Sequence, residues 1–359
     1  MEHRRGILFM LFLIFWWLMF IFVLGMVFAF MPQEHDSTVL AIFGSPFFII
    51  FQQIMLLLVP LGVWLGMHGE KLTPHLPHIK LGSINTIYIV MLSLLLQPIM
   101  MTVSGITTFF FPNEVSEMLV GMRAQPLWLM LLAIAVTPAI CEEVVFRGYI
   151  QSTYKSRPFW QAALVNGLFF GIIHFNPQQF PYAFGMGIIF AYMVYITRSI
   201  RAGVISHFIM NASQVTLLWI VTSDTVTNWM EYATDELAAY NYYDYLYLEQ
   251  MERIGIIAGY IMVGLVVVGG IIGTVYVFRA FALHNQKRFS TPDTNVDENP
   301  EIVTLEPTTR KDRLLNAALI LAIVVLYVFF IFVTSYTTNT ESDYLTLQTR
   351  TLPILTSAL

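Results

Sequence analysis

The chain has 359 residues, of which 57% are hydrophobic and only 11% charged, and its mean hydropathy is +0.68. A soluble domain usually carries about 25% charged residues, so this composition excludes an ordinary soluble protein. The formal net charge of −5 provides no basic surface for a nucleic-acid partner, and the single cysteine, Cys141, excludes an intramolecular disulfide.

The first apolar run covers residues 7–31 and directly follows the basic residues Arg4 and Arg5. Basic residues before an apolar run could mark a secretory signal peptide, but the apolar region of such a peptide has only about 7–15 residues and ends at a cleavage site of small residues. The run here is much longer and ends in Met31 and Pro32. It therefore predicts a first helix that stays in the membrane.

Eight further apolar runs approach or exceed the length needed to cross about 30 Å of hydrocarbon. The sequence thus predicts an all-α transmembrane bundle of about nine spans. It divides into N-terminal helices over residues 1–124, a core over 125–222, and a segment over 223–359 with an outer loop, two further spans, an inner loop and a C-terminal tail. The eight runs are residues 39–67, 84–102, 127–146, 159–174, 184–197, 202–221, 254–278 and 314–334.

The distribution of Lys and Arg predicts the orientation, because these residues accumulate on the cytoplasmic side of a membrane. If the N-terminus lies inside, fifteen of the 18 Lys and Arg residues fall in inner segments, and only Arg123, Arg253 and Arg350 fall in outer ones. The loop over residues 223–252 has acidic residues but no Lys or Arg. We therefore expect the N-terminus inside and the C-terminus outside.

This topology predicts the accessibility of two loops. A cysteine placed at Asp235 should react with an impermeant reagent from outside, and one at Asp297 should react only from inside, because the eighth span separates them. Finding both positions on the same side would show that the eighth span does not cross the membrane.

Two adjacent acidic residues do not fit a loop or terminus. Of the 23 Asp and Glu residues, 21 lie in loops, at termini or beside basic partners, whereas Glu142 and Glu143 lie near the inner end of an apolar run. An acidic side chain at the centre of a membrane costs at least ~2.5 kcal/mol. His174 and His207 are likewise histidines within apolar runs, so we expect the chemistry of the protein at these residues.

Helical spacing suggests how these residues are used. Glu143 and Arg147 are four positions apart, so they share a helix face and can form an ion pair. Glu142, turned by about 100° on the same helix, is then left for another task. His207 and Asn211 are also four positions apart, and they project from one face of their helix.

The depth of His174 is less simple. At ~1.5 Å per residue, Glu142 and His207 lie at similar depths near the inner boundary, whereas His174 lies about 22 Å from Phe159 on an upright helix. Either that helix is strongly tilted, or residues 151–160 dip into the membrane before it begins.

Three short motifs occur in order along these spans. Glu142 to Arg147 reads EExxxR, Phe170 to His174 reads FxxxH, and His207 to Asn211 reads HxxxN. Together they resemble the CPBP family, which comprises the type II CAAX prenyl endopeptidases and bacterial relatives linked to bacteriocin processing and self-immunity. The resemblance extends over about residues 126–221, and the three motifs together are far more specific than any one alone.

This resemblance implies an intramembrane endopeptidase that acts near the cytoplasmic face. Glu142 with His174 would activate a water molecule, and His207 with Asn211 would donate hydrogen bonds to the oxyanion. The implied partners are a peptide or membrane-protein substrate and the lipid bilayer, and the implied location is a bacterial plasma membrane. Neither the identity of the substrate nor the oligomeric state follows from the sequence.

The resemblance leaves two versions of the mechanism open. Glu142, His174 and His207 are acceptable zinc ligands with water in the fourth position. The metal-free version, without any cofactor, is favoured because the carboxamide of Asn211 suits an oxyanion donor better than a metal ligand. Glu143 and Arg147 would form a supporting ion pair in either version.

Two other classes of function also fit part of the pattern. Intramembrane Glu, His and Arg residues can build the proton relay of a transporter, but here they cluster at one depth and no inverted repeat is visible. A non-catalytic scaffold or immunity protein with the same fold is the second alternative, because a fold alone does not fix activity.

Overall fold

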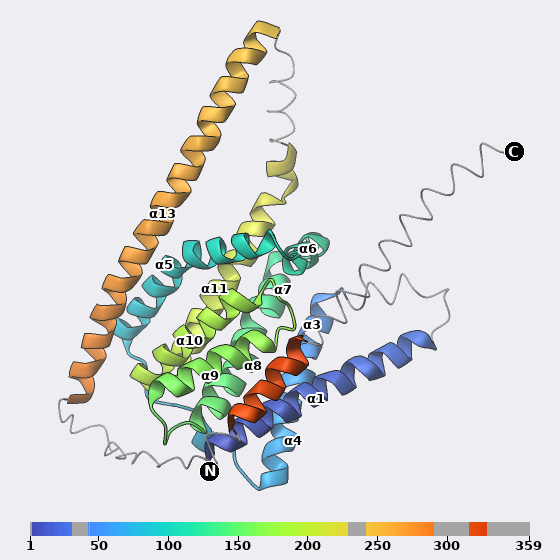
Figure 1. The fold of residues 1–359 in the computed structure, drawn as a ribbon, viewed down its shortest axis with the longest axis vertical. Coiled ribbons are helices and arrows are strands. Elements are labelled where there is room, and N and C mark those ends of the chain that lie inside the picture. Colours follow the sequence, from blue (N-terminus) through green and yellow to red (C-terminus); the bar gives the residue numbers. More distant parts are fainter. Residues whose placement is uncertain (1, 31–41, 43, 229–241, 291–315, 329–359) are drawn as a thin grey trace, which may run out of the picture.

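A computed structural model describes residues 2–30, 42, 44–228, 242–290 and 316–328 of the chain. Across these residues the protein is a helical bundle, and the one β-bridge they contain joins His78 to Ser199 (Figure 1). The predicted all-α membrane fold is therefore confirmed. The loop positions Asp235 and Asp297 lie outside the described residues.

The helices are numbered as in Figure 1. In chain order they are α1 (Glu2–Ala29), α3 (Pro46–Gln53), η2 (Ile54–Leu58), α4 (Val59–His68), η3 (Thr73–His75), α5 (Ser83–Thr108), α6 (Glu114–Gly121), α7 (Leu127–Leu131), η4 (Leu132–Val136), α8 (Thr137–Glu143), η5 (Val144–Ile150), α9 (Phe159–Ile172), α10 (Phe180–Thr197), α11 (Ile200–Val221) and α13 (Tyr242–Ser290).

Seven helical segments in the described part of the chain are long and apolar enough to cross a membrane. They are His3–Val27, Pro46–His68, Ser83–Thr108, Leu127–Ile150, Phe180–Thr197, Ile200–Val221 and Arg253–Arg288. Two shorter apolar helices, Phe159–Ile172 and Asn316–Val328, occupy the fifth and ninth predicted runs. A span needs about 20 residues, so these two are shorter than a full upright crossing.

Three wide, π-helical turns interrupt the helices near the acidic pair. One, η2, joins α3 to α4, and the other two, η4 and η5, flank α8 on either side. A π-helical turn re-aims the side chains that follow it and is often found at functional sites. All three turns lie next to residues of the candidate site described below.

Helices α9 and α10 pack closely as an antiparallel pair, and their contact depends on glycines. A Cβ atom added at Gly187 would lie 2.7 Å from the Cα of Gly167, closer than two such atoms can approach. The chain then turns at Arg198, whose φ of 51° is left-handed, before α11 begins. Helix α11 packs against α8, and α9 and α10 pack against η5, which continues α8.

The linker between η5 and α9 is folded into the protein. Ser152, Thr153 and Arg157 in it are buried, and Ser152 lies 2.7 Å from His75 of the α4–α5 loop. The linker that precedes α9 is therefore part of the packed core of the protein.

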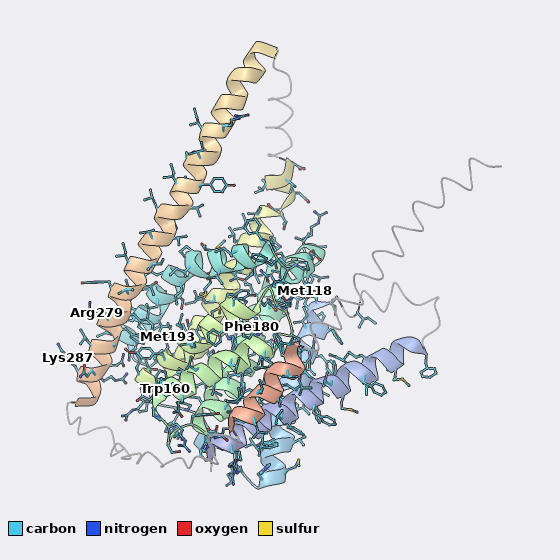
Figure 2. All side chains as sticks on the ribbon, viewed as in Figure 1. Met118, Trp160, Phe180, Met193, Arg279 and Lys287 are labelled. Atoms are coloured by element: carbon cyan, nitrogen blue, oxygen red, sulfur yellow. The ribbon has the colours of Figure 1, made fainter. Side chains whose placement is uncertain are left out.

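The longest helix, α13, extends far beyond the rest of the bundle (Figure 1). It packs against α5 and α10, and two buried carboxamides join it to α5. Asn85 and Asn285 each donate from Nδ2 to Oδ1 of the other, at 3.0 and 2.9 Å. The basic residues Arg279 and Lys287 lie at this same end of α13 (Figure 2).

Candidate active site

The acidic pair ends α8, and one oxygen of Glu143 is held by two structural contacts. Its side chain is buried, and Oε1 accepts hydrogen bonds from Arg147 Nη1 at 2.8 Å and from His207 Nδ1 at 3.0 Å. The guanidinium also donates from Nη2 to the carbonyl oxygen of Gly187 at 3.2 Å. Glu143 and Arg147 thus connect α8 and η5 to α10 and α11, and the ion pair expected from their spacing is present.

The charge of Arg147 lies among aromatic rings. Its guanidinium carbon is 4.4 Å from the ring centre of Phe170 and 5.2 Å from that of Phe190. Such contacts stabilise a cation that is removed from water. The same Phe170 ring lies edge-on to His174 and His207, at 5.1 and 5.7 Å between ring centres, so the Phe of FxxxH connects the ion pair to both histidines.

Helix α11 can approach Glu143 because of a glycine one turn before His207. A Cβ atom added at Gly203 would collide with the Glu143 carboxylate. Gly203 is therefore required for the His207–Glu143 hydrogen bond. The sequence analysis did not single out this glycine, and the only signal was its place one helical turn before a motif histidine.

The two nitrogens of His207 face different carboxylates. Because a carboxylate only accepts hydrogen bonds, Nδ1 must carry the hydrogen that it donates to Glu143. Nε2 lies 3.8 Å from Glu142 Oε2, which is too long for a direct hydrogen bond. Nε2 can serve as an oxyanion donor only when the ring carries both hydrogens.

Glu142 has an oxygen available for chemistry. It is 6% exposed, and its Oε1 accepts a hydrogen bond from Gln53 Nε2 at 3.2 Å. Its Oε2 is buried and has no hydrogen-bond partner in the described part of the chain. Oε2 of Glu143 also has no hydrogen-bond partner among the described residues, but Glu143 is completely buried and ion-paired with Arg147, so Glu142 is the more accessible of the two carboxylates. The sequence analysis missed Gln53, for which the only signal was an amide within an apolar run.

His174 lies in the turn after α9, and its ring contacts the same Phe170 ring as does His207, whose Nε2 lies 3.8 Å from Glu142. Its Nδ1 is 2.6 Å from the carbonyl oxygen of Phe170. A carbonyl only accepts, so Nδ1 carries the hydrogen, and Nε2 of the neutral ring is left as an acceptor. The three motif residues Glu142, His174 and His207 therefore lie in one neighbourhood.

The turn after His174 is held in an unusual conformation. Phe175 has a left-handed φ of 47°, which costs energy for a residue with a bulky side chain. Its ring contacts Trp17 of α1 and Tyr327 of the C-terminal helix, at 5.0 and 6.4 Å between ring centres. The next residue, Asn176, accepts from the backbone nitrogens of residues 178 and 179. These contacts fix the orientation of His174.

One of the two amide hydrogens of Asn211 is used in a contact within the protein. Its Nδ2 donates to the carbonyl oxygen of Ile134 in η4 at 3.0 Å. A carboxamide nitrogen carries two hydrogens, so one remains for a ligand. The side chain is half-buried, next to the carbonyl group that the π-helical turn presents to α11.

The zinc version of the mechanism requires three converging ligands. Among the described residues, no group of three or more His, Cys, Asp or Glu side chains is arranged to hold a metal ion. Glu142, His174 and His207 thus do not form a ligand set in this structure, and we derive no step through zinc.

Comparison with known proteins points to the same segment. Residues 124–213 match the family model of the type II CAAX prenyl endopeptidase Rce1-like proteins. The chain is also similar to the Bacillus subtilis (strain 168) protein named "Putative membrane peptidase YdiL", with 27% identity over 110 residues. That alignment covers 30% of this chain and 43% of the relative, so the chain spans less than half of the relative's length.

No solved structure matches the chain. The family-model match covers the segment that carries EExxxR, FxxxH and HxxxN. The resemblance of the three motifs to the type II CAAX prenyl endopeptidases is therefore confirmed by the family-model match.

Proposed function

We propose that this protein hydrolyses a peptide bond within the membrane, with Glu142 as the general base. The observation that carries the proposal is the contrast between the two buried glutamates. Glu143 is completely buried and ion-paired with Arg147, whereas Glu142 is 6% exposed and its Oε1 accepts from the neutral amide of Gln53. Because Arg147 pairs directly with Glu143, Glu142 is the carboxylate of the two that is better able to accept a proton.

In the proposed reaction, a water molecule donates one hydrogen to Glu142 Oε2 and attacks the carbonyl carbon of the substrate. Glu142 takes the proton as the carbon–oxygen bond forms, and negative charge develops on the carbonyl oxygen. Asn211, through its second amide hydrogen, and doubly protonated His207 would stabilise this oxyanion. His174 then relays the proton to the departing amine as the carbon–nitrogen bond breaks.

The arrangement suits this chemistry because the site is dry. Hydrogen bonds to a developing charge are stronger where water is excluded, and Glu142, Glu143 and His207 are all buried. The proposed substrate is a peptide or membrane protein whose scissile bond lies near the cytoplasmic face. This location assumes that the N-terminus lies inside, as the distribution of Lys and Arg predicts.

The direct test is a comparison of cleavage products. Membranes from cells that carry the intact protein and from cells that carry Glu142→Ala should be compared by mass spectrometry of protein N-termini. We expect a set of new N-termini that depends on the intact protein and is missing from the variant. Identical sets in both membranes, at equal protein levels, would argue against peptidase activity.

A further prediction separates the metal-free mechanism from the zinc version. Exhaustive chelation should leave cleavage by the purified protein unchanged, and Asn211→Ala should lower turnover about 10²–10³-fold, the usual loss for one oxyanion donor. Substrate binding should change little, since the bond to the oxyanion forms only in the transition state. Turnover and elemental composition of the purified protein are the measurements.

The zinc version gives the opposite pattern. Activity would vanish on chelation and return with added metal, and both His174→Ala and His207→Ala would lose bound zinc while Asn211→Ala would keep it. Stoichiometric zinc that is lost in both histidine variants would overturn the metal-free mechanism.

A further inference from the structure

One polar contact to the site comes from outside the segment that matches the family model. Gln53 is the last residue of α3, and its Nε2 donates to Glu142 Oε1 at 3.2 Å. The match covers residues 124–213, so this contact joins the N-terminal helices to the motif glutamate over 89 positions of sequence.

The position of Gln53 is fixed by its surroundings. The π-helical turn η2 begins at the next residue, and Trp16 of α1 donates from Nε1 to the carbonyl oxygen of Met55 in that turn at 2.9 Å. The segments α3 and η2 both pack against α8, which carries Glu142. Gln53 is thus held between α1 and α8, and its amide is aimed at the carboxylate.

Each side chain of this hydrogen-bonded pair has a second buried polar atom. Gln53 Oε1 and Glu142 Oε2 both lack a hydrogen-bond partner in the described part of the chain. Each belongs to a group whose other polar atom takes part in the Gln53–Glu142 hydrogen bond. Leaving a buried acceptor unsatisfied costs about 1–3 kcal/mol, and one water molecule that donates to both oxygens would satisfy the pair.

We infer that Gln53 is a positioning residue for the nucleophilic water: its amide N–H fixes Oε1 of Glu142, and its amide oxygen accepts the water hydrogen that Glu142 does not remove. A water held by two acceptors directs a lone pair away from both of them, toward the substrate carbonyl. This inference rests on the proposed peptidase function and adds to the active site a residue from the N-terminal helices.

The test uses paired glutamine variants. A fluorogenic peptide that spans a cleavage site found with the intact protein serves as substrate for the purified full-length chain. Gln53→Met removes both polar atoms at similar length, and we expect kcat to fall about 10- to 100-fold with KM within about twofold. The matched control is Gln52→Met, on the adjacent half-buried glutamine of the same helix, which should leave both constants near those of the parent.

A second readout does not depend on turnover. The infrared band of the Glu142 carboxylate can be assigned from the difference between the parent and Glu142→Gln. Loss of the amide donor in Gln53→Met should shift this band, and Gln52→Met should not. If the parent cleaves no peptide, the proposed function fails. In that case the infrared measurement alone decides whether Gln53 orients Glu142.

A conservative variant separates positioning from packing. Gln53→Glu keeps the size of the side chain, and in its protonated form it still offers a donor to Glu142 and an acceptor to the water. Two adjacent carboxyl groups hold one proton between them and lose it as pH rises. We therefore expect Gln53→Glu to retain activity at acidic pH and to lose it at alkaline pH, whereas the parent keeps its activity there.

The inference is overturned if the parent cleaves and Glu142→Gln does not, while Gln53→Met turns over at the parent rate. An unshifted carboxylate band in Gln53→Met overturns it as well. Should Gln53→Met fail to fold, Gln53→Glu decides, because equal activity across the pH range would show that neither the amide donor nor its acceptor is needed.

Discussion

Replacing Glu142 by Gln should lower the rate of peptide cleavage about 10²–10⁴-fold, the usual loss when a general base is removed. The substitution keeps the size of the side chain and its ability to bond Gln53, but a carboxamide cannot accept the proton of water at neutral pH. Membrane insertion and the unfolding temperature should stay near those of the parent. Initial rates with the fluorogenic peptide and a thermal melt in detergent are the measurements.

The adjacent residue provides the control. Glu143→Gln removes the charge that Arg147 and His207 share, so it should lower stability as well as activity, whereas Glu142→Gln should affect activity alone. Cleavage by Glu142→Gln within about threefold of the parent would remove this residue from the mechanism.

Replacing Arg147 by Met should destabilise the folded protein by about 3–5 kcal/mol, because breaking a buried ion pair leaves the other charge without compensation. Arg147 and Glu143 are completely buried, so water cannot replace the lost guanidinium. The loss should appear as a lower unfolding temperature and a lower protein level in the membrane. Arg201→Met, on an exposed arginine of α11, should change stability little.

Removing the Glu143 carboxylate as well tests whether the unpaired charge causes the loss of stability. The double variant Arg147→Met with Glu143→Leu leaves no unpaired charge between the two positions, so it should recover part of the stability that Arg147→Met loses. A melt of Arg147→Met equal to that of the parent would mean that the buried pair does not support the fold.

Much of the fold follows from simple sequence properties. Apolar runs of about 20 residues predict spanning helices because lipid leaves no partner for backbone groups outside a helix. The runs predicted at 39–67 and 84–102 correspond to the helical segments Pro46–His68 and Ser83–Thr108. Each agrees with its prediction within one residue at one end and differs by six or seven residues at the other. The three π-helical turns were not predicted, because a single inserted residue does not alter composition or the length of an apolar run.

The candidate site was predictable only in part. The i, i+4 spacing of Glu143 and Arg147 correctly indicated their ion pair and left Glu142 unpaired by Arg147. The hydrogen bond from His207 to Glu143 could not be foreseen, since it depends on how closely α11 approaches α8 at Gly203. Gln53 lies 89 positions from Glu142, and no local pattern indicates which of two adjacent glutamines faces a distant helix.

The Asn85–Asn285 pair has a consequence for how the protein meets bilayers of different thickness. The helical segment Arg253–Arg288 of α13 has 36 residues, and its apolar run over residues 254–278 alone is about 37 Å long at 1.5 Å per residue, against about 30 Å of hydrocarbon. Because the carboxamide pair holds one end of this helix to α5, the excess length has to be accommodated at the other end, by tilt or by protrusion. Hydrophobic mismatch is thereby concentrated at a free helix end remote from Glu142, so a change in bilayer thickness can re-aim α13 without disturbing the geometry of the site.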